Sequence, residues 1–93
     1  MTDKQLKRNL QSIGKTCFVN YFSKFANFAL SNDDIVEQMK KNENYTKKAC
    51  QSRTSHARSI IRAGRSRDAL INICESCVPD HVHDRARQLL EEV

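Results

Sequence analysis

The stretch TKKACQSRTSHARSIIRAG, from Thr46 to Gly64, decides how the rest of the chain is organised. Its small and apolar residues recur at the three- and four-residue steps of an α-helix, and Thr46 and Gly64 suit the N-cap and the left-handed position after the C-terminus. At about 100° per residue, one arc of roughly 140° holds Ala49, Cys50, Thr54, Ala57, Ile60 and Ile61. The stretch therefore predicts an amphipathic helix from Thr46 to Ala63.

The opposite face of this predicted helix carries only cationic, amide and hydroxyl side chains. Between Thr46 and Arg67 there are seven Lys or Arg residues and no acid, whereas the rest of the chain holds nine basic and eleven acidic residues. The net charge of +5 therefore originates in this one segment, and localised positive charge attracts polyanions. We expect a nucleic-acid-binding surface formed by Lys47, Lys48, Gln51, Ser52, Ser55, Arg58, Ser59, Arg62 and Arg65. A merely solvated face is the plainer alternative.

Five other amphipathic segments surround this helix in the sequence. Their apolar stripes predict helices that start at Thr2 or Asp3, run from Lys15 to Ala29, run from Ser31 to about Lys41, run from Ser66 through Cys77, and start at Pro79. The Phe-rich segment from Lys15 to Ala29 is the expected centre of the core. Two Gly and one Pro are too few for a sandwich or barrel. We predict an all-α fold: one domain over residues 1–93, a compact bundle of five to six short helices.

Two segments resemble a known DNA-binding unit. Leu30 to Met39 (LSNDDIVEQM) resembles the first helix of the helix-turn-helix in region 4 of bacterial sigma factors, and Ser52 to Arg62 (SRTSHARSIIR) resembles the second half of its recognition helix. Together they cover about a quarter of the chain. The resemblance implies a helix-turn-helix-like unit that binds the DNA major groove. It also implies that bases are contacted near the start of the second helix, by Lys47, Lys48, Gln51 and Ser52.

Arg53 is the exception among the cations of this helix, because it falls inside the apolar arc. An unpaired guanidinium there is costly. We predict that Arg53 is a structural clamp that pairs with Asp33, Asp34 or Glu37 of the preceding helix.

Cys74, Cys77, His81 and His83 place four zinc-ligand side chains within ten residues. Structural Cys/His sites usually separate their two ligand pairs by a dozen or so residues, so we expect buried cysteines, surface histidines, no metal and no cofactor. Metal binding by these four residues stays open. No nucleophile lies next to a base and no glycine loop suits a phosphate, so the sequence does not predict an enzyme.

No apolar run has the length of a membrane span, and the first residues lack the pattern of a signal peptide. We expect a cytoplasmic protein with reduced cysteines. The leading hypothesis is a small DNA-binding regulator of transcription. A non-catalytic helical adaptor that binds an acidic protein partner is the alternative, and both RNA as the ligand and a homodimer formed through the Phe-rich helix stay open.

Overall fold

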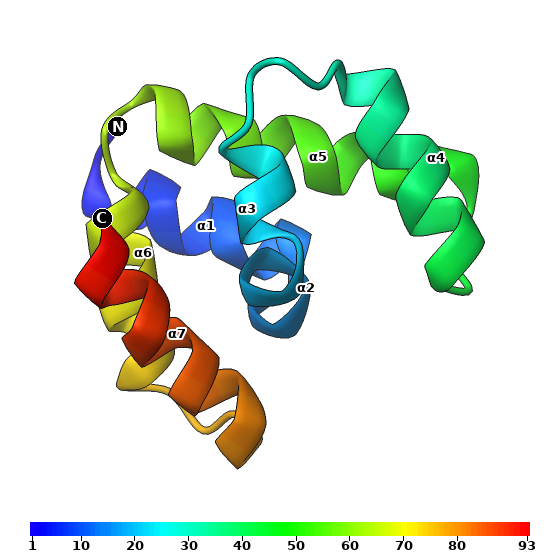
Figure 1. The fold of residues 1–93 in the computed structure, drawn as a ribbon. Coiled ribbons are helices and arrows are strands. Elements are labelled where there is room, and N and C mark those ends of the chain that lie inside the picture. The colour runs from blue at the N-terminus through cyan, green and yellow to red at the C-terminus, as the bar shows by residue number, and fades with distance from the viewer.

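A computed structural model describes all 93 residues and contains helices but no strands (Figure 1). The helices are α1 (Asp3–Ile13), α2 (Lys15–Asn20), α3 (Phe22–Phe25), α4 (Asn32–Asn42), α5 (Lys47–Arg62), α6 (Ser66–Cys74) and α7 (Asp80–Glu92). The predicted all-α class is therefore confirmed. None of these helices has the length and apolar character that would let it cross a membrane.

Helix α5, rather than the Phe-rich segment, has the most helical neighbours. It packs against α1, α3, α4 and α6, while α6 and α7 form a hairpin that also reaches α2. Figure 1 shows α5 running along one side of the molecule, with α4 against one end and the α6–α7 hairpin beyond the other. The apolar arc is buried as predicted at Cys50, Thr54, Ala57 and Ile60. Burial of such an arc stabilises a helix more than its intrinsic propensity does.

The predicted helix starts are confirmed where a hydroxyl residue precedes the helix. Thr2 and Ser31 each form a capping box, in which the hydroxyl accepts a bond from a backbone N–H and a side chain three residues later accepts from the cap. Thr46 accepts a hydrogen bond from the backbone N–H of Ala49 at 3.1 Å. Gly64 has the predicted positive φ, +73°, after α5.

The predicted continuous helix from Lys15 to Ala29 is wrong. It divides at Tyr21 into α2 and α3 and then ends at Phe25. The Asn27 side chain explains the end, because its oxygen accepts from the Ala29 N–H at 3.1 Å and so offers the backbone a turn in place of a helix. This division gives seven helices where five to six were expected.

Three of the four Phe rings in that segment lie in the core as predicted. Phe18, Phe22 and Phe25 are buried, with Phe18 packed edge-on against Phe22. These three rings are covered by the chain itself. Phe28, the fourth ring, is exposed.

The predicted extension of the fifth helix to Cys77 is also wrong, because α6 ends at Cys74. The Ser76 hydroxyl donates to the Asn72 carbonyl at 2.7 Å, and the Ser76 backbone N–H donates to the Ile73 carbonyl at 3.0 Å. These bonds turn the chain tightly. Cys77 is left exposed instead of buried.

Candidate nucleic-acid interface

Seven of the nine predicted binding residues lie exposed on α5, and we call them the outer face: Lys47, Lys48, Gln51, Ser52, Ser55, Ser59 and Arg62. No acidic side chain belongs to this face. The molecule has only two ion pairs, and both involve Arg65, so no carboxylate lies within ion-pair distance of any outer-face cation. The cations of the outer face are therefore not ion-paired within the protein.

The side chains in the middle of the outer face project only a short way from the helix. The Ser59 hydroxyl donates to the Ser55 carbonyl at 3.0 Å, so it lies back along the helix. Nδ1 of His56, at the half-buried edge of the face, lies 2.7 Å from the Ser52 carbonyl oxygen. Small side chains held close to the helix let another molecule's backbone approach it closely, while the cations occupy the two ends.

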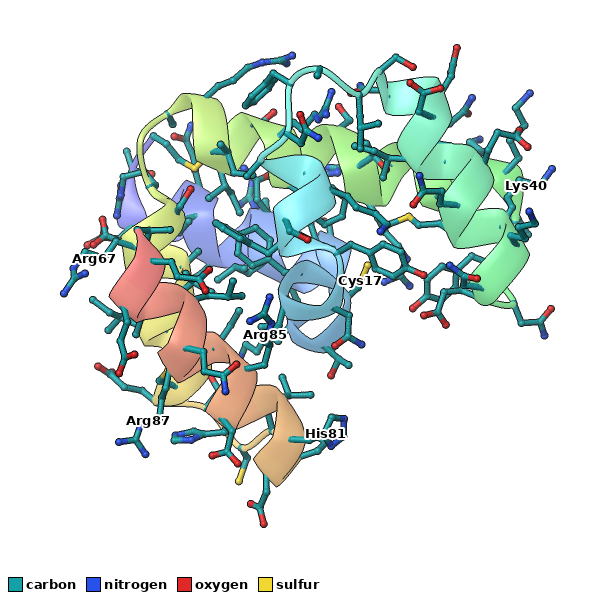
Figure 2. All side chains as sticks on the ribbon, in the orientation of Figure 1. Cys17, Lys40, Arg67, His81, Arg85 and Arg87 are labelled. Carbon is teal, nitrogen blue, oxygen red and sulfur yellow. The ribbon has the colours of Figure 1, made fainter.

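Two lysines that sequence reasoning missed extend the positive charge at the start of α5. Lys40 and Lys41 lie in the last turn of α4, and only residues 43–46 separate that helix from Lys47. Both are exposed. Figure 2 shows Lys40 projecting from one end of the molecule, opposite the end that carries Arg67 and Arg87. The Lys-Lys pair was the available signal, but within a polar stretch rich in Asn it indicates only a loop.

The predicted outward position of Arg58 is wrong. Its residue surface is 3% exposed, and its guanidinium faces the chain between α3 and α4. Nε donates to the Phe25 carbonyl at 3.2 Å, Nη1 donates to Oδ1 of Asn32 at 2.9 Å, and Nη2 donates to the carbonyls of Asn27 at 2.9 Å and Leu30 at 2.8 Å. These bonds engage most of its N–H groups, so Arg58 has little to offer a ligand.

Arg58 is buried where main-chain carbonyls lack another donor: those of Phe25 and Leu30 accept from Arg58, whereas that of Asn27 also accepts from the Leu30 N–H. Unbonded carbonyls at a helix end need donors, and a guanidinium supplies five N–H groups in a fixed fork. Arg58 lies at the flank of α5 rather than at its outermost line, so its side chain reaches them. Burial, and secondarily the nearby Arg62, lower the pKa of Arg58, but a guanidinium stays protonated at neutral pH.

Arg65 is also wrongly assigned to the binding surface. It forms ion pairs with Asp3 and with Asp68, the latter at 2.6 Å, and it donates to the Met1 carbonyl. Hydrogen bonds to Asp3 and then Asp68 raise its pKa. Its charge is therefore satisfied within the molecule, where it ties α1 to the start of α6.

The predicted partners of Arg53 are wrong, although its inward position is confirmed. It pairs with none of the acids of α4. Its Nη1 donates to the Ile13 carbonyl at the end of α1, and its guanidinium carbon lies 4.1 Å from the centre of the Tyr45 ring. A Cβ added to Gly14 would lie 3.1 Å from that Nη1, and Gly14 also has a φ of +86°. Glycine at this position therefore allows the positive φ of the turn and leaves space for the Arg53 guanidinium.

The cysteines and histidines do not form a cluster. No three His, Cys, Asp or Glu side chains lie close enough together to hold a metal ion, and all four cysteines are free. Cys17 and Cys50 are buried, whereas Cys77 and His81 are exposed. Burial raises the pKa of the Cys17 thiol to about 11, despite the opposing effect of Arg53. Cys17 is therefore a neutral core residue at physiological pH.

Comparison of the chain with protein-family models, with curated protein sequences and with solved structures found no match in any of the three.

Proposed function

We propose that this protein binds nucleic acid through the outer face of α5, and that it does so without catalysis. One observation carries the proposal: the outer face is exposed, free of acids and not ion-paired within the molecule. Phosphate neutralisation supplies most of the affinity of such surfaces. Lys47, Lys48 and Arg62 are the phosphate-binding residues, with Lys40 and Lys41 extending the positive charge at one end.

A helix-turn-helix-like arrangement is the finer part of the proposal. Helices α4 and α5 pack against each other, and the outer face of α5 points away from that contact. In such an arrangement the second helix enters the major groove with its first residues toward the bases. Gln51 and Ser52 would then face the base edges, and transcription regulation would be the role.

The inward position of Arg58 changes what the face can recognise. Arginine makes the commonest specific contact, a bidentate bond to guanine, whereas Gln pairs best with adenine. With Arg58 turned inward, Arg62 is the one arginine left on the outer face, and it lies in the last turn of α5, whereas Gln51 lies near the start of the helix. We therefore propose that phosphate contacts contribute more to affinity than base contacts do.

The test is a fluorescence anisotropy titration against labelled duplex DNA, single-stranded DNA and RNA at two salt concentrations. The double substitution Lys47→Ala, Lys48→Ala should weaken binding and lower the slope of log affinity against log salt by roughly 0.7 to 0.9 for each phosphate that the protein no longer neutralises. The matched control is Arg85→Ala, Arg87→Ala, which removes the same charge from exposed positions on α7.

The outcomes separate the competing functions. A larger loss of affinity for the α5 pair than for the α7 pair supports the outer face as the binding site. Equal losses would mean that net charge, and no particular surface, attracts the ligand. Absence of binding to all three nucleic acids at low salt would rule out the proposal and favour the acidic protein partner.

A further inference from the structure

Phe28 is the one large apolar residue away from the chain ends that is exposed to solvent. Its residue surface is 50% exposed, and the only other exposed large hydrophobic residues, Met1 and Val93, lie at the two chain ends. A single exposed apolar residue is common and does not by itself identify a site. The surroundings of Phe28 supply the further evidence.

The backbone that carries Phe28 is held in place from both sides. Arg58 donates to the Asn27 carbonyl at 2.9 Å and to the Leu30 carbonyl at 2.8 Å, which bracket the ring in sequence. The Leu30 N–H also closes a turn on the Asn27 carbonyl at 3.0 Å. A side chain presented by an already ordered turn loses less entropy when a ligand binds.

The ring also borders the outer face. The guanidinium carbon of Arg62, an outer-face residue, lies 5.3 Å from the centre of the Phe28 ring, and that of Arg58 lies 4.8 Å from it. Both distances are those of cation–π contacts. An exposed aromatic ring therefore adjoins Arg62, the cation at one end of the outer face, which forms no ion pair with a carboxylate.

This combination is the one that single-stranded nucleic acids require. Cations follow the phosphates, and aromatic rings or guanidinium planes stack on bases that are not already stacked in a duplex. A base inside a duplex has both faces covered by its neighbours, so it gains nothing from Phe28 unless the helix opens.

We propose that Phe28 and Arg62 form a stacking subsite for an unpaired nucleobase. The proposal rests on the proposed nucleic-acid binding and is an alternative to its helix-turn-helix part, because it makes single-stranded nucleic acid, or an unpaired nucleotide in a folded RNA, the preferred ligand of the outer face in place of duplex DNA. A strand bound there would run along α5 toward Lys48, which lies about 21 Å from Arg62 along the helix, so several nucleotides would separate the two contacts.

The first test compares variants of Phe28 in titrations with a labelled single strand of about 12 nucleotides and with the same sequence as a duplex. Phe28→Ala should weaken single-strand binding roughly tenfold and leave duplex binding within about twofold. Phe28→Tyr should keep the wild-type affinity because it keeps the ring. Phe28→Leu, which is apolar but cannot stack, should behave like Phe28→Ala.

The salt dependence gives a readout that is independent of affinity. Phe28→Ala removes no charge, so the slope against salt should be unchanged, whereas the Lys47→Ala, Lys48→Ala protein should show a smaller slope. Thermal unfolding of each variant checks that the half-exposed ring is not needed for folding. If Phe28→Ala is too unstable, Phe28→Leu provides the same comparison.

A second test uses the absence of tryptophan from this chain. Phe28→Trp introduces one fluorophore at the subsite, and stacking of a base on it should quench its emission when the single strand is added. Nucleic-acid binding with no quenching, and with full affinity in Phe28→Ala, would overturn the subsite while leaving the proposed function intact. Absence of any binding would overturn both.

Discussion

Both sides of α5 carry positively charged side chains, but these side chains have different partners within the molecule. On the inner side, Arg53 and Arg58 donate to main-chain carbonyls, Arg53 at the end of α1 and Arg58 around the end of α3. On the outer side, Lys48 and Arg62 have no carboxylate within ion-pair distance. The comparison shows that positive charge on a helix does not by itself identify a ligand site; the acceptors within reach decide it.

The inner arginines are stabilised without carboxylates. The last carbonyls of a helix carry partial negative charge, and a cation placed there donates hydrogen bonds to them and interacts favourably with that charge. The molecule has no buried side-chain nitrogen or oxygen without a hydrogen-bond partner. Arg53 and Arg58 therefore cap two helices that α5 packs against, and the following predictions test this difference between the two sides.

Removal of the Arg58 guanidinium should cause the largest effect. Arg58→Met keeps much of the volume but leaves the Phe25 and Leu30 carbonyls without their donor, so we expect a decrease of about 3–5 kcal/mol in the free energy of unfolding. Chemical denaturation followed by circular dichroism measures it. Arg58→Lys keeps the charge with three donors instead of five and should recover only part of this stability. An Arg58→Met protein as stable as wild type would show that the hydrogen bonds of Arg58 make no net contribution to the free energy of unfolding.

Arg53 should follow, because it makes one main-chain bond where Arg58 makes several. Arg53→Met should lower the free energy of unfolding by about 2–3 kcal/mol, because it leaves the Ile13 carbonyl unpaired and removes the cation from the Tyr45 ring. The same denaturation experiment applies. A decrease larger than that of Arg58→Met would reverse the order that the hydrogen bonds predict.

The thiol beside Arg53 should make stability depend on pH. Burial raises the pKa of Cys17 from 9.0 to about 11, so between these values the folded chain keeps a proton that the unfolded chain releases. The contribution of Cys17 to the free energy of unfolding is complete below pH 9 and is lost as pH rises through 11. The free energy of unfolding then decreases by up to about 3 kcal/mol. The pKa values of Cys50, Tyr21 and Tyr45 are also raised. The measurement is the free energy of unfolding as a function of pH for wild type and for Cys17→Ala. The difference between the two slopes gives the contribution of Cys17, and equal slopes would contradict the prediction.

Outer-face substitutions should have the smallest effect on stability. The triple substitution Lys47→Ala, Lys48→Ala, Arg62→Ala removes cations that make no ion pair, so the free energy of unfolding should change by less than about 1 kcal/mol. Thermal unfolding checks this. A decrease as large as that of Arg53→Met would mean that these side chains support the fold, and the distinction between the two sides would fail.

Much of the fold followed from patterns that local chemistry enforces. Capping residues at Thr2, Ser31 and Thr46 fixed three helix starts, and the apolar stripe of α5 was buried as its spacing indicated. The break after Phe25 was missed, because the Asn27 side chain bonds the Ala29 N–H and Arg58 takes the Phe25 carbonyl. Local periodicity contains no such information.

The site was predicted less well for a related reason. A helical wheel sorts residues by angle, but Arg58 lies at the flank, where a neighbouring segment decides whether a side chain faces water or protein. Its acceptors come from residues 24–32, more than twenty positions earlier in the chain. Arg65 pairs with Asp68, an i,i+3 neighbour that the sequence does show, and also with Asp3, which is distant in sequence. Such distant pairings depend on tertiary structure, which the pattern of one segment does not contain.

Because α5 is wedged among α1, α3, α4 and α6, it cannot shift relative to the body of the protein without opening the core. A ligand bound as we propose would therefore meet a helix held by its neighbours, and we expect most of the shape change during association to occur in the ligand. A single strand bends around such a helix at little cost, whereas duplex DNA is stiff over about 150 base pairs and has to present a groove already suited to it.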